Sequence, residues 1–227
     1  MSERMDLAID VISDVACPWC FIGMKRLDRA IALADDVNVT VRWRPYQLDP
    51  TIPHGGIPRR DYMLKKFGSE ERLREIHDHV VGAGAAEGIR FNFDAMQVAA
   101  NTLDAHRLIR WAASPQAPEG AQERTVRRLF QFNFEEARDI GDHAVLTEAA
   151  GDAGLDVALV ETLLASNADE ESVRTEIGTA TQMGVSGVPC FLLEGKYAVM
   201  GAQEPETLAE AFRQVAAAKA RGELQTE

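Results

Sequence analysis

Strand-forming segments occur only near the two ends of this 227-residue chain. Residues 7–13 are mostly apolar and β-branched, as in a strand that is covered on both faces, and residues 37–44 alternate between apolar and polar side chains. The strand pattern returns at 188–193 and 197–200, where a short turn between the two segments predicts a hairpin. A single sheet can form only if the first and last quarters of the chain meet.

The remaining segments have the periodicity of helices. Residues 18–34 repeat apolar side chains every three or four positions, with Pro18 in the first turn, and a final helix is expected from Pro205 to about Lys219. Strand, helix and strand in this order normally make parallel neighbours through a right-handed crossover. Between the two ends the pattern predicts helices at 61–67, 70–86, 95–113, 121–136, 145–153, 156–164 and 169–182, with Asp142 and Asp156 as N-caps.

The order β-α-β, helical block, β-β-α predicts an α/β protein with a thioredoxin-like core and a long all-helical insertion. Residues 1–59 and 181–227 would form the discontinuous thioredoxin-like domain. Residues 60–180 would form the inserted helical subdomain.

Charge and composition exclude several partners. The formal net charge of -12 disfavours binding to nucleic acid or to anionic lipid, and no apolar run is long enough to span a membrane. The N-terminal residues do not have the pattern of an export signal, so we expect a cytoplasmic protein. In that reducing compartment, a close cysteine pair is expected to be catalytic, redox-sensing or metal-binding.

Two of the three cysteines form the sequence Cys17-Pro18-Trp19-Cys20 at the expected junction of strand and helix. Cys17 would lie at the helix start, where free N–H groups and the helix dipole stabilise a thiolate. Cys20, one turn into the helix, can resolve a mixed disulfide, so the pair predicts thiol–disulfide exchange. Pro18 and Trp19 supply no cation, which predicts a pair less oxidising than one with a basic residue at position 19.

The alternatives are half of a zinc site or two buried thiols. The chain has no second C-x-x-C and no H-x3-5-H sequence to complete a tetrahedral site. His77 and His79 lie two residues apart on a predicted helix and point away from each other. We therefore expect no metal.

A second motif is the stretch from Gly184 to Phe191, in which Pro189 stands where a strand begins. A trans proline that opens an edge strand would be the ordinary interpretation. In a thioredoxin-like fold this loop lies against the cysteine pair, which favours a cis Val188–Pro189 bond. Such a bond would expose the backbone of Val188 to an extended substrate peptide.

With these motifs the sequence resembles the DsbA-type thioredoxin-fold oxidoreductases, in particular their cytosolic FrnE-like branch, over nearly the whole chain. The matching segments are 17–23, 43–50, 101–107, 184–191 and 201–203. The resemblance implies that Cys17 is the nucleophile, Cys20 the resolving cysteine, and Pro189 a cis-proline preceded by Val188. It also implies that the inserted helices cap the active-site face.

Members of this family are described as dithiol–disulfide oxidoreductases or isomerases. The expected partner is a protein that contains a disulfide, or a small thiol. Glutathione could serve as an exchange partner, and no bound cofactor is expected. Whether the protein forms a homodimer is left open.

Four further residues have more than one interpretation. Cys190, where relatives more often carry a non-thiol residue, is either a small apolar strand residue or a third thiol that exchanges with the pair. Asp10 is either solvated or a buried proton carrier for the second cysteine, and Asp14 is either solvated or an N-cap of the helix. His106 is either a hydrogen-bonded core histidine or a residue that touches a ligand from the insertion.

Two other functional classes remain. Kappa-type glutathione transferases and hydroxychromene-carboxylate isomerases look similar, but typically lack the second cysteine, so Cys20 argues against them. The third class is a non-enzymatic binding module in which the cysteine pair senses redox state.

Overall fold

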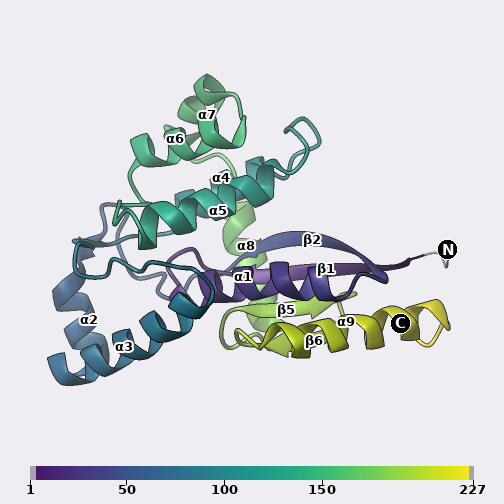
Figure 1. The fold of residues 1–227 in the computed structure, drawn as a ribbon. Coiled ribbons are helices and arrows are strands. Elements are labelled where there is room, and N and C mark those ends of the chain that lie inside the picture. The colour runs from purple at the N-terminus through teal and green to yellow at the C-terminus, as the bar shows by residue number, and fades with distance from the viewer. Residues whose placement is uncertain (1–3, 225–227) are drawn as a thin grey trace.

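The computed structural model describes residues 4–224 and brings the two ends of the chain together in one four-stranded sheet (Figure 1). The strand order is β2-β1-β5-β6. The parallel pair β1–β2 runs from Met5 opposite Val37 to Ser13 opposite Pro45, while β5 and β6 are antiparallel to their neighbours. The bounds of the strands are β1 Met5–Ser13, β2 Val37–Pro45, β5 Cys190–Leu193 and β6 Tyr197–Met200. The predicted β-α-β and β-β-α halves of a thioredoxin-like core are therefore confirmed.

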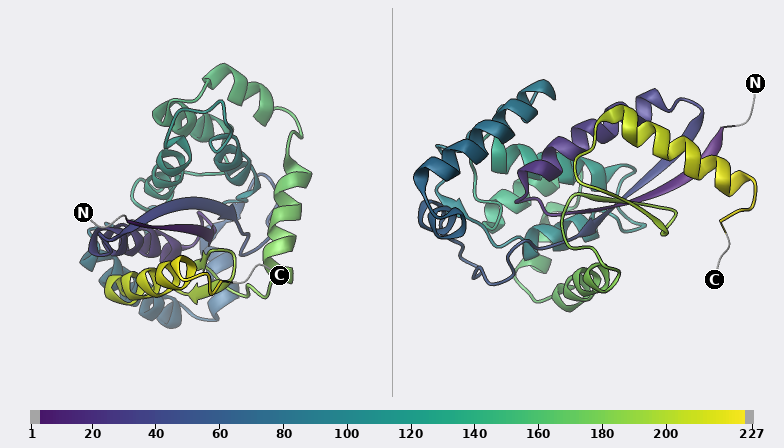
Figure 2. Two further views of the ribbon diagram at one scale, coloured as in Figure 1. Left: turned by 90° about the vertical axis from the view of Figure 1, so that its right-hand side faces the viewer. Right: turned by 90° about the horizontal axis from the view of Figure 1, so that it is seen from below.

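Helices cover both faces of this sheet. On one face, α1 (Pro18–Leu33) packs against α9 (Pro205–Ala220), and α9 also contacts β1. On the other face lies α8 (Glu170–Gln182), as the right-hand view of Figure 2 shows. The strand residues alternate accordingly, because Val11 belongs to the main core whereas Ile12 packs with Ala180 of α8.

Six further helices form a lobe that extends beyond the sheet. Their bounds are α2 Arg59–Phe67, α3 Glu70–Ala86, α4 Leu103–Trp111, α5 Ala121–Phe134, α6 His143–Ala153 and α7 Val157–Leu164. As predicted, Asp142 and Asp156 cap helices, with side chains that accept hydrogen bonds from the N–H groups of Ala144 and Leu159. One hydrophobic core runs from the sheet into this lobe, and α8 contacts both β2 and α4. The expected boundary between residues 180 and 181 falls within the last turn of α8.

The helix predicted over residues 95–113 begins only at Leu103, so that prediction was wrong for residues 95–102. Within this stretch, β4 (Val98–Ala99) pairs with β3 (Ile57–Pro58) in a short antiparallel ladder. Asn101 then accepts a hydrogen bond from Leu103 N and donates one to the carbonyl of Ile52. Hydrogen bonds to residues 52–58 thus take the place of the backbone hydrogen bonds of a helix in this stretch. The insertion is therefore not all-helical as predicted, because it contains this ladder.

Within residues 4–224, none of the helices combines the length and the hydropathy that crossing a membrane needs.

Candidate active site

The two cysteines of the C-x-x-C motif lie where β1 passes into α1. Pro18 opens the helix and Cys17 occupies the N-cap position, with extended backbone angles of φ -94° and ψ 115°. The turn is closed by a hydrogen bond from Cys17 N to Asp14 O (2.9 Å), and Cys20 N donates to Cys17 O (3.0 Å). The Cys17 thiol therefore lies at the helix N-terminus, and Cys20 follows one turn later.

The cysteines differ in what surrounds them. Cys17 borders a cavity, whereas Cys20 is almost completely buried, with 1% of its surface exposed. Burial raises the pKa of Cys20 well above its usual value, and the hydrogen bond and charge of Cys17 raise it further, against the opposing effects of Ser13 and the Asp14 backbone. Cys20 is therefore a neutral thiol at pH 7, and all three cysteines of the chain are free.

The loop before β5 meets the cysteine pair. The Val188–Pro189 peptide bond is cis, as predicted, and the Cys17 thiol donates a hydrogen bond to the carbonyl oxygen of Val188 (3.7 Å). Pro189 O in turn accepts a hydrogen bond from Gly201 N (2.8 Å). A Cβ atom at Gly23 of α1 would lie 2.9 Å from Cγ of Pro189, so the helix can approach this loop only because residue 23 is glycine.

Asp14 does not cap α1, so this part of the prediction was wrong. Its Oδ1 accepts a hydrogen bond from Ala16 N (3.1 Å) and its Oδ2 accepts one from Leu48 N (2.8 Å). The carboxylate is almost fully buried and ties the turn before Cys17 to the loop that follows β2. Solvation of Asp14 is excluded for the same reason.

His106 lies in the core beside this carboxylate. Its Nε2 is 3.5 Å from Oδ1 of Asp14 and has no hydrogen-bond partner among the residues that the structure describes. The expected core position is therefore found without the expected hydrogen bond at Nε2. His106 does not border the cavity next to Cys17.

Asp10 is bound by two arginines of the neighbouring strand. Its carboxylate oxygens accept hydrogen bonds from Arg42 Nη2 (2.8 Å) and Arg44 Nε (2.7 Å). None of these bonds reaches the cysteine pair. The structure thus gives Asp10 ion-pair partners, and no contact that would make it a proton carrier.

Cys190 points to the opposite face of the sheet from the pair. It is fully buried in a cluster with Ile12, Ala180 and Val185, beneath α8. The pair itself belongs to the core on the α1 side. Of the two interpretations of Cys190, this placement fits the small apolar strand residue.

The cavity beside Cys17 has a volume of about 420 Å³. On one side it is bordered by the cysteine motif and Val188, and on the other by residues of the helical lobe, namely Arg59, Tyr62, Met63, Lys66, Ile76, His77 and Val80. Trp19 contacts the lobe directly, because its ring lies 5.4 Å from that of His79, whereas His77 faces the cavity. The two histidines therefore do not meet, and the lobe borders the active-site face as the resemblance implied.

Two residues of this site were not identified from the sequence. Asn133 of α5 borders the cavity and donates a hydrogen bond to the carbonyl of Val15 (3.1 Å), 118 residues away in the chain. Arg59 opens α2 and borders the same cavity. Neither belongs to a local motif, so only the tertiary structure identifies them.

Similar proteins carry the same fold over nearly the whole chain. The crystal structure of a probable DsbA oxidoreductase, SCO1869 from Streptomyces coelicolor, is 31% identical, with a TM-score of 0.82 over 97% of this chain and 92% of that one. A 2-hydroxychromene-2-carboxylate isomerase is 17% identical, with a TM-score of 0.68 over 96% of this chain and 100% of that one. The cytosolic disulfide reductase DsbM from Pseudomonas aeruginosa is 18% identical, with a TM-score of 0.59 over the same shares. The last two show a common fold alone.

A family model assigns the chain by sequence. The model of the DSBA-like thioredoxin domain matches residues 8–213, which include the cysteine pair, the helical lobe and the cis-proline loop. The chain therefore belongs to the family of DSBA-like thioredoxin domains.

Proposed function

We propose that this protein is a cytoplasmic dithiol–disulfide oxidoreductase of the FrnE-like branch, acting through Cys17 and Cys20. One observation carries the proposal. The Cys17 thiol lies at the start of α1 and borders an open cavity, while Cys20 is buried one turn behind it. Cys17 is itself mostly buried, with 5% of its surface exposed, but it borders the cavity through which a substrate could reach it. An attacking thiol that a substrate can reach, backed by a second thiol, is the arrangement that disulfide exchange requires.

In the proposed reaction the Cys17 thiolate attacks one sulfur of a substrate disulfide. A mixed disulfide forms and the first substrate thiol leaves. Cys20 then loses its proton and attacks the Cys17 sulfur, which releases the second thiol and leaves a Cys17–Cys20 disulfide. The substrate has gained two electrons and two protons, and an external thiol such as glutathione would restore the dithiol.

The loop before β5 would hold the substrate during this exchange. The backbone of Val188 lies against the Cys17 thiol, where an extended peptide could pair with it. We therefore include both proteins that contain a disulfide and small thiols as partners. The proposed cytoplasmic location is in line with the description of DsbM as cytosolic.

A second candidate is a glutathione-dependent isomerase or transferase. The fold likeness to a 2-hydroxychromene-2-carboxylate isomerase and the small-molecule dimensions of the cavity favour it. The retention of Cys20 argues against it. A redox-sensing binding module is the third candidate, and it differs from both enzymes because it would show no turnover.

The test is the reduction of a peptide disulfide by dithiothreitol, with the protein as catalyst. We expect catalysis by the wild type, none by Cys17→Ser, and a trapped mixed disulfide on Cys17 in the Cys20→Ser variant. Full activity of Cys17→Ser would contradict the proposal. Turnover that occurs only as conjugation or isomerisation with glutathione would support the second candidate instead.

A further inference from the structure

The cavity next to Cys17 contains an arginine without an acidic partner. Arg59 is half-buried, and its guanidinium carbon lies 5.4 Å from the ring centre of Phe93. Its hydrogen bonds within the protein are long, 3.5 Å to the carbonyl of Phe93 and 3.4 Å to Nε2 of His77. No carboxylate of residues 4–224 lies within ion-pair distance of it.

The surroundings of Arg59 disfavour its charge. Burial lowers the pKa of Arg59, and the charge of Asp94, which is not in ion-pair contact, opposes this only in part. Burial and the charge of Arg59 also lower the pKa of His77, which keeps that imidazole neutral at pH 7 and able to accept a hydrogen bond from Arg59. Even partial burial of a cation without a counter-ion costs free energy, so a ligand that supplies the negative charge would be favoured.

Arg59 has N–H groups that make no hydrogen bond within the described residues and could bind such a ligand. A guanidinium carries five N–H groups, and the protein engages two of the nitrogens, Nη1 and Nη2, through one long bond each. The planar group can bind both oxygens of a carboxylate at once. A second cation, Lys66, borders the same cavity and also has no acidic partner within ion-pair distance in the described residues.

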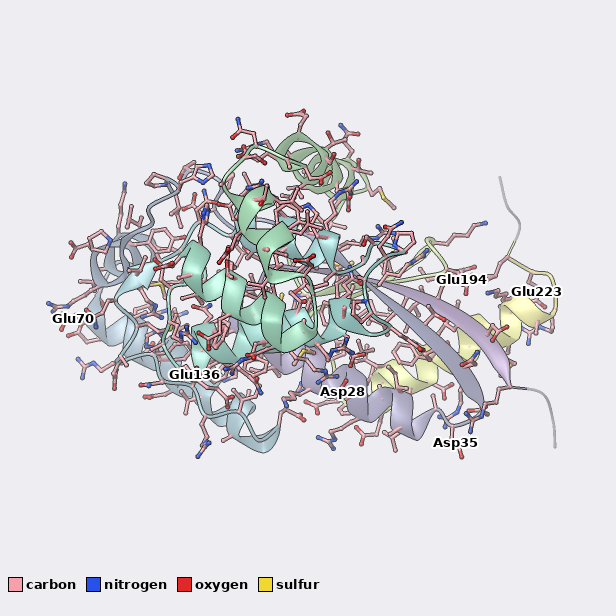
Figure 3. All side chains as sticks on the ribbon, turned by 90° about the horizontal axis from the view of Figure 1, so that it is seen from above. Asp28, Asp35, Glu70, Glu136, Glu194 and Glu223 are labelled. Carbon is pink, nitrogen blue, oxygen red and sulfur yellow. The ribbon has the colours of Figure 1, made fainter. Side chains whose placement is uncertain are left out.

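The acidic residues of the cavity are already occupied. Asp14 accepts two backbone hydrogen bonds, and Asp49 accepts hydrogen bonds from the backbone and the hydroxyl of Thr51. Elsewhere, buried carboxylates such as Asp10, Glu87 and Asp104 pair with arginines, and other acidic side chains, for example Asp35, Glu70 and Glu223, lie at the edge of the molecule (Figure 3). Arg59 and Lys66, which have no ion-pair partner within residues 4–224, therefore border the same cavity as Cys17 in a chain with a net charge of -12.

We propose that the cavity takes a small disulfide that carries a carboxylate, and that Arg59 binds this carboxylate while Cys17 attacks the adjacent disulfide. The inference rests on the proposed function and specifies its substrate class. A volume of about 420 Å³ accommodates a small molecule but not a folded protein. In the reaction one S–S bond of the substrate is broken and the Cys17–Cys20 bond forms, with two electrons and two protons passing to the two thiols released.

The experiment compares two disulfides of similar length, of which only one carries carboxylates, so that the effect of the negative charge on the rate of exchange can be measured. The probes are 3,3'-dithiodipropionate, which has two carboxylates, and 2-hydroxyethyl disulfide, which has none. Reduced protein is mixed with an excess of each, thiols are trapped at intervals, and the second-order rate constant for oxidation of Cys17 and Cys20 is measured. The variant is Arg59→Gln, and the matched control is Arg60→Gln, whose side chain is exposed and pairs with Glu70 on the surface.

We expect Arg59→Gln to lower the rate constant for the dicarboxylate by about tenfold or more, because a charge-assisted bond is lost, and to change that for the neutral disulfide by less than about twofold. Arg60→Gln should change neither constant by more than about twofold, since exposed ion pairs contribute little. Arg59→Lys, which keeps the charge, should retain part of the preference for the dicarboxylate. The neutral disulfide reports whether each variant has folded with a working cysteine pair.

The possible failures differ in what they show. If neither disulfide oxidises the wild-type pair, the inference of a small disulfide substrate is overturned, and the reduction of a peptide disulfide described above decides whether the proposed function also fails. If both oxidise it, but Arg59→Gln slows the two equally or not at all, the function stands and the inference about Arg59 is overturned.

Discussion

At the scale of single residues, Cys17 and Cys20 are both buried, but only Cys17 borders the cavity. Cys17 lies at a helix start beside a cavity, and Cys20 is buried behind it with a raised pKa. In the proposed reaction this difference sets the order of events. Cys17 reacts first, and Cys20 becomes a nucleophile only when its proton has been removed.

The raised pKa of Cys20 predicts a loss of stability at high pH in the reduced protein. Above about pH 8.5 the thiol ionises in the unfolded chain, while in the folded protein it stays protonated up to its raised pKa. Its contribution is thus complete below about pH 8.5 and declines as the pH rises, by at most about 1.4 kcal/mol per pH unit.

Urea unfolding of fully reduced protein between pH 7 and 10.5 measures this slope, and Cys20→Ala should make it shallower. Cys190→Ala provides a second test and should have an effect of the same sign, because burial also raises the pKa of that thiol. Identical slopes for the wild type and Cys20→Ala would contradict the assignment.

The position of Cys190 predicts that it takes no part in the exchange. It lies on the α8 face of the sheet, whereas the pair lies on the α1 face. Mass mapping of disulfides after oxidation should therefore give the same Cys17–Cys20 species in the wild type and in Cys190→Ser. A disulfide that includes Cys190 in the folded wild type would disprove this.

The site residues that were predictable from the sequence are those marked by a local motif. Residues whose role depends on contacts far along the chain were not predictable. Cys17 and Cys20 were identified by their spacing, and Pro189 was identified because the predicted fold places its loop against that pair. Asp14 was misassigned because one of its partners, Leu48 N, is 34 residues away, and nothing local indicates that contact. Arg59 was missed because its distinguishing feature is that no carboxylate of residues 4–224 lies within ion-pair distance of it. Only the three-dimensional structure shows this.

At the scale of elements, the contact between α1 and the loop before β5 depends on Gly23. A Cβ atom there would lie 2.9 Å from Cγ of Pro189 and 3.4 Å from the ring of Phe191. Gly23→Ala should therefore destabilise the protein by about 1 to 3 kcal/mol and slow exchange, because the helix that carries the cysteines must shift.

Gly82 in α3 offers a matched control, since no atom lies within 4 Å of the position where its Cβ would be built. Gly82→Ala should stabilise the protein by about 0.5 to 1 kcal/mol, because alanine is the better helix former. Both values come from urea unfolding. Equal effects of the two substitutions would show that the close approach at Gly23 is unimportant.

The elements themselves were largely predictable, because strand alternation and helix periodicity are local signals. The four sheet strands and the helices at 70–86 and 156–164 lie close to their expected positions. The failure at 95–102 has a non-local cause. These residues pair with Ile57–Pro58 and bind Ile52 through Asn101, and no pattern within the segment reveals such partners.

At the scale of the whole molecule, a buried ion pair fastens the helical lobe to the sheet domain. Glu87, at the end of α3, accepts hydrogen bonds from Arg26 and Arg29 of α1, and only 2% of its side chain is exposed. That the two ends of the chain meet was predictable from the order of elements. The packing of the lobe against α1 depends on ion pairs such as this one, between residues 61 positions apart. It was therefore not predictable in detail.

Loss of this pair should weaken the attachment of the lobe. Glu87→Gln leaves Arg26 with the carbonyl of Ala202 and one exposed acidic partner, Glu204. The substitution should therefore lower the free energy of unfolding by about 2 kcal/mol, less than if a buried charge lost every partner. The control is Glu75→Gln on the same helix, where the pair with Arg72 is exposed and the change should stay below about 1 kcal/mol. Equal values in urea unfolding would contradict the role given to Glu87.

The central claim is that Cys17 and Cys20 form a reversible redox pair. Its most direct test is the reduction potential of the pair, measured by equilibrating the protein in glutathione buffers and trapping the free thiols, with Cys20→Ser as the control. We predict a two-electron couple at or above the cytosolic glutathione poise of roughly -220 to -260 mV, but below the roughly -120 mV of the strongest dithiol oxidants, because Pro18 and Trp19 supply no cation. If no disulfide forms between Cys17 and Cys20 in any buffer, the account is wrong.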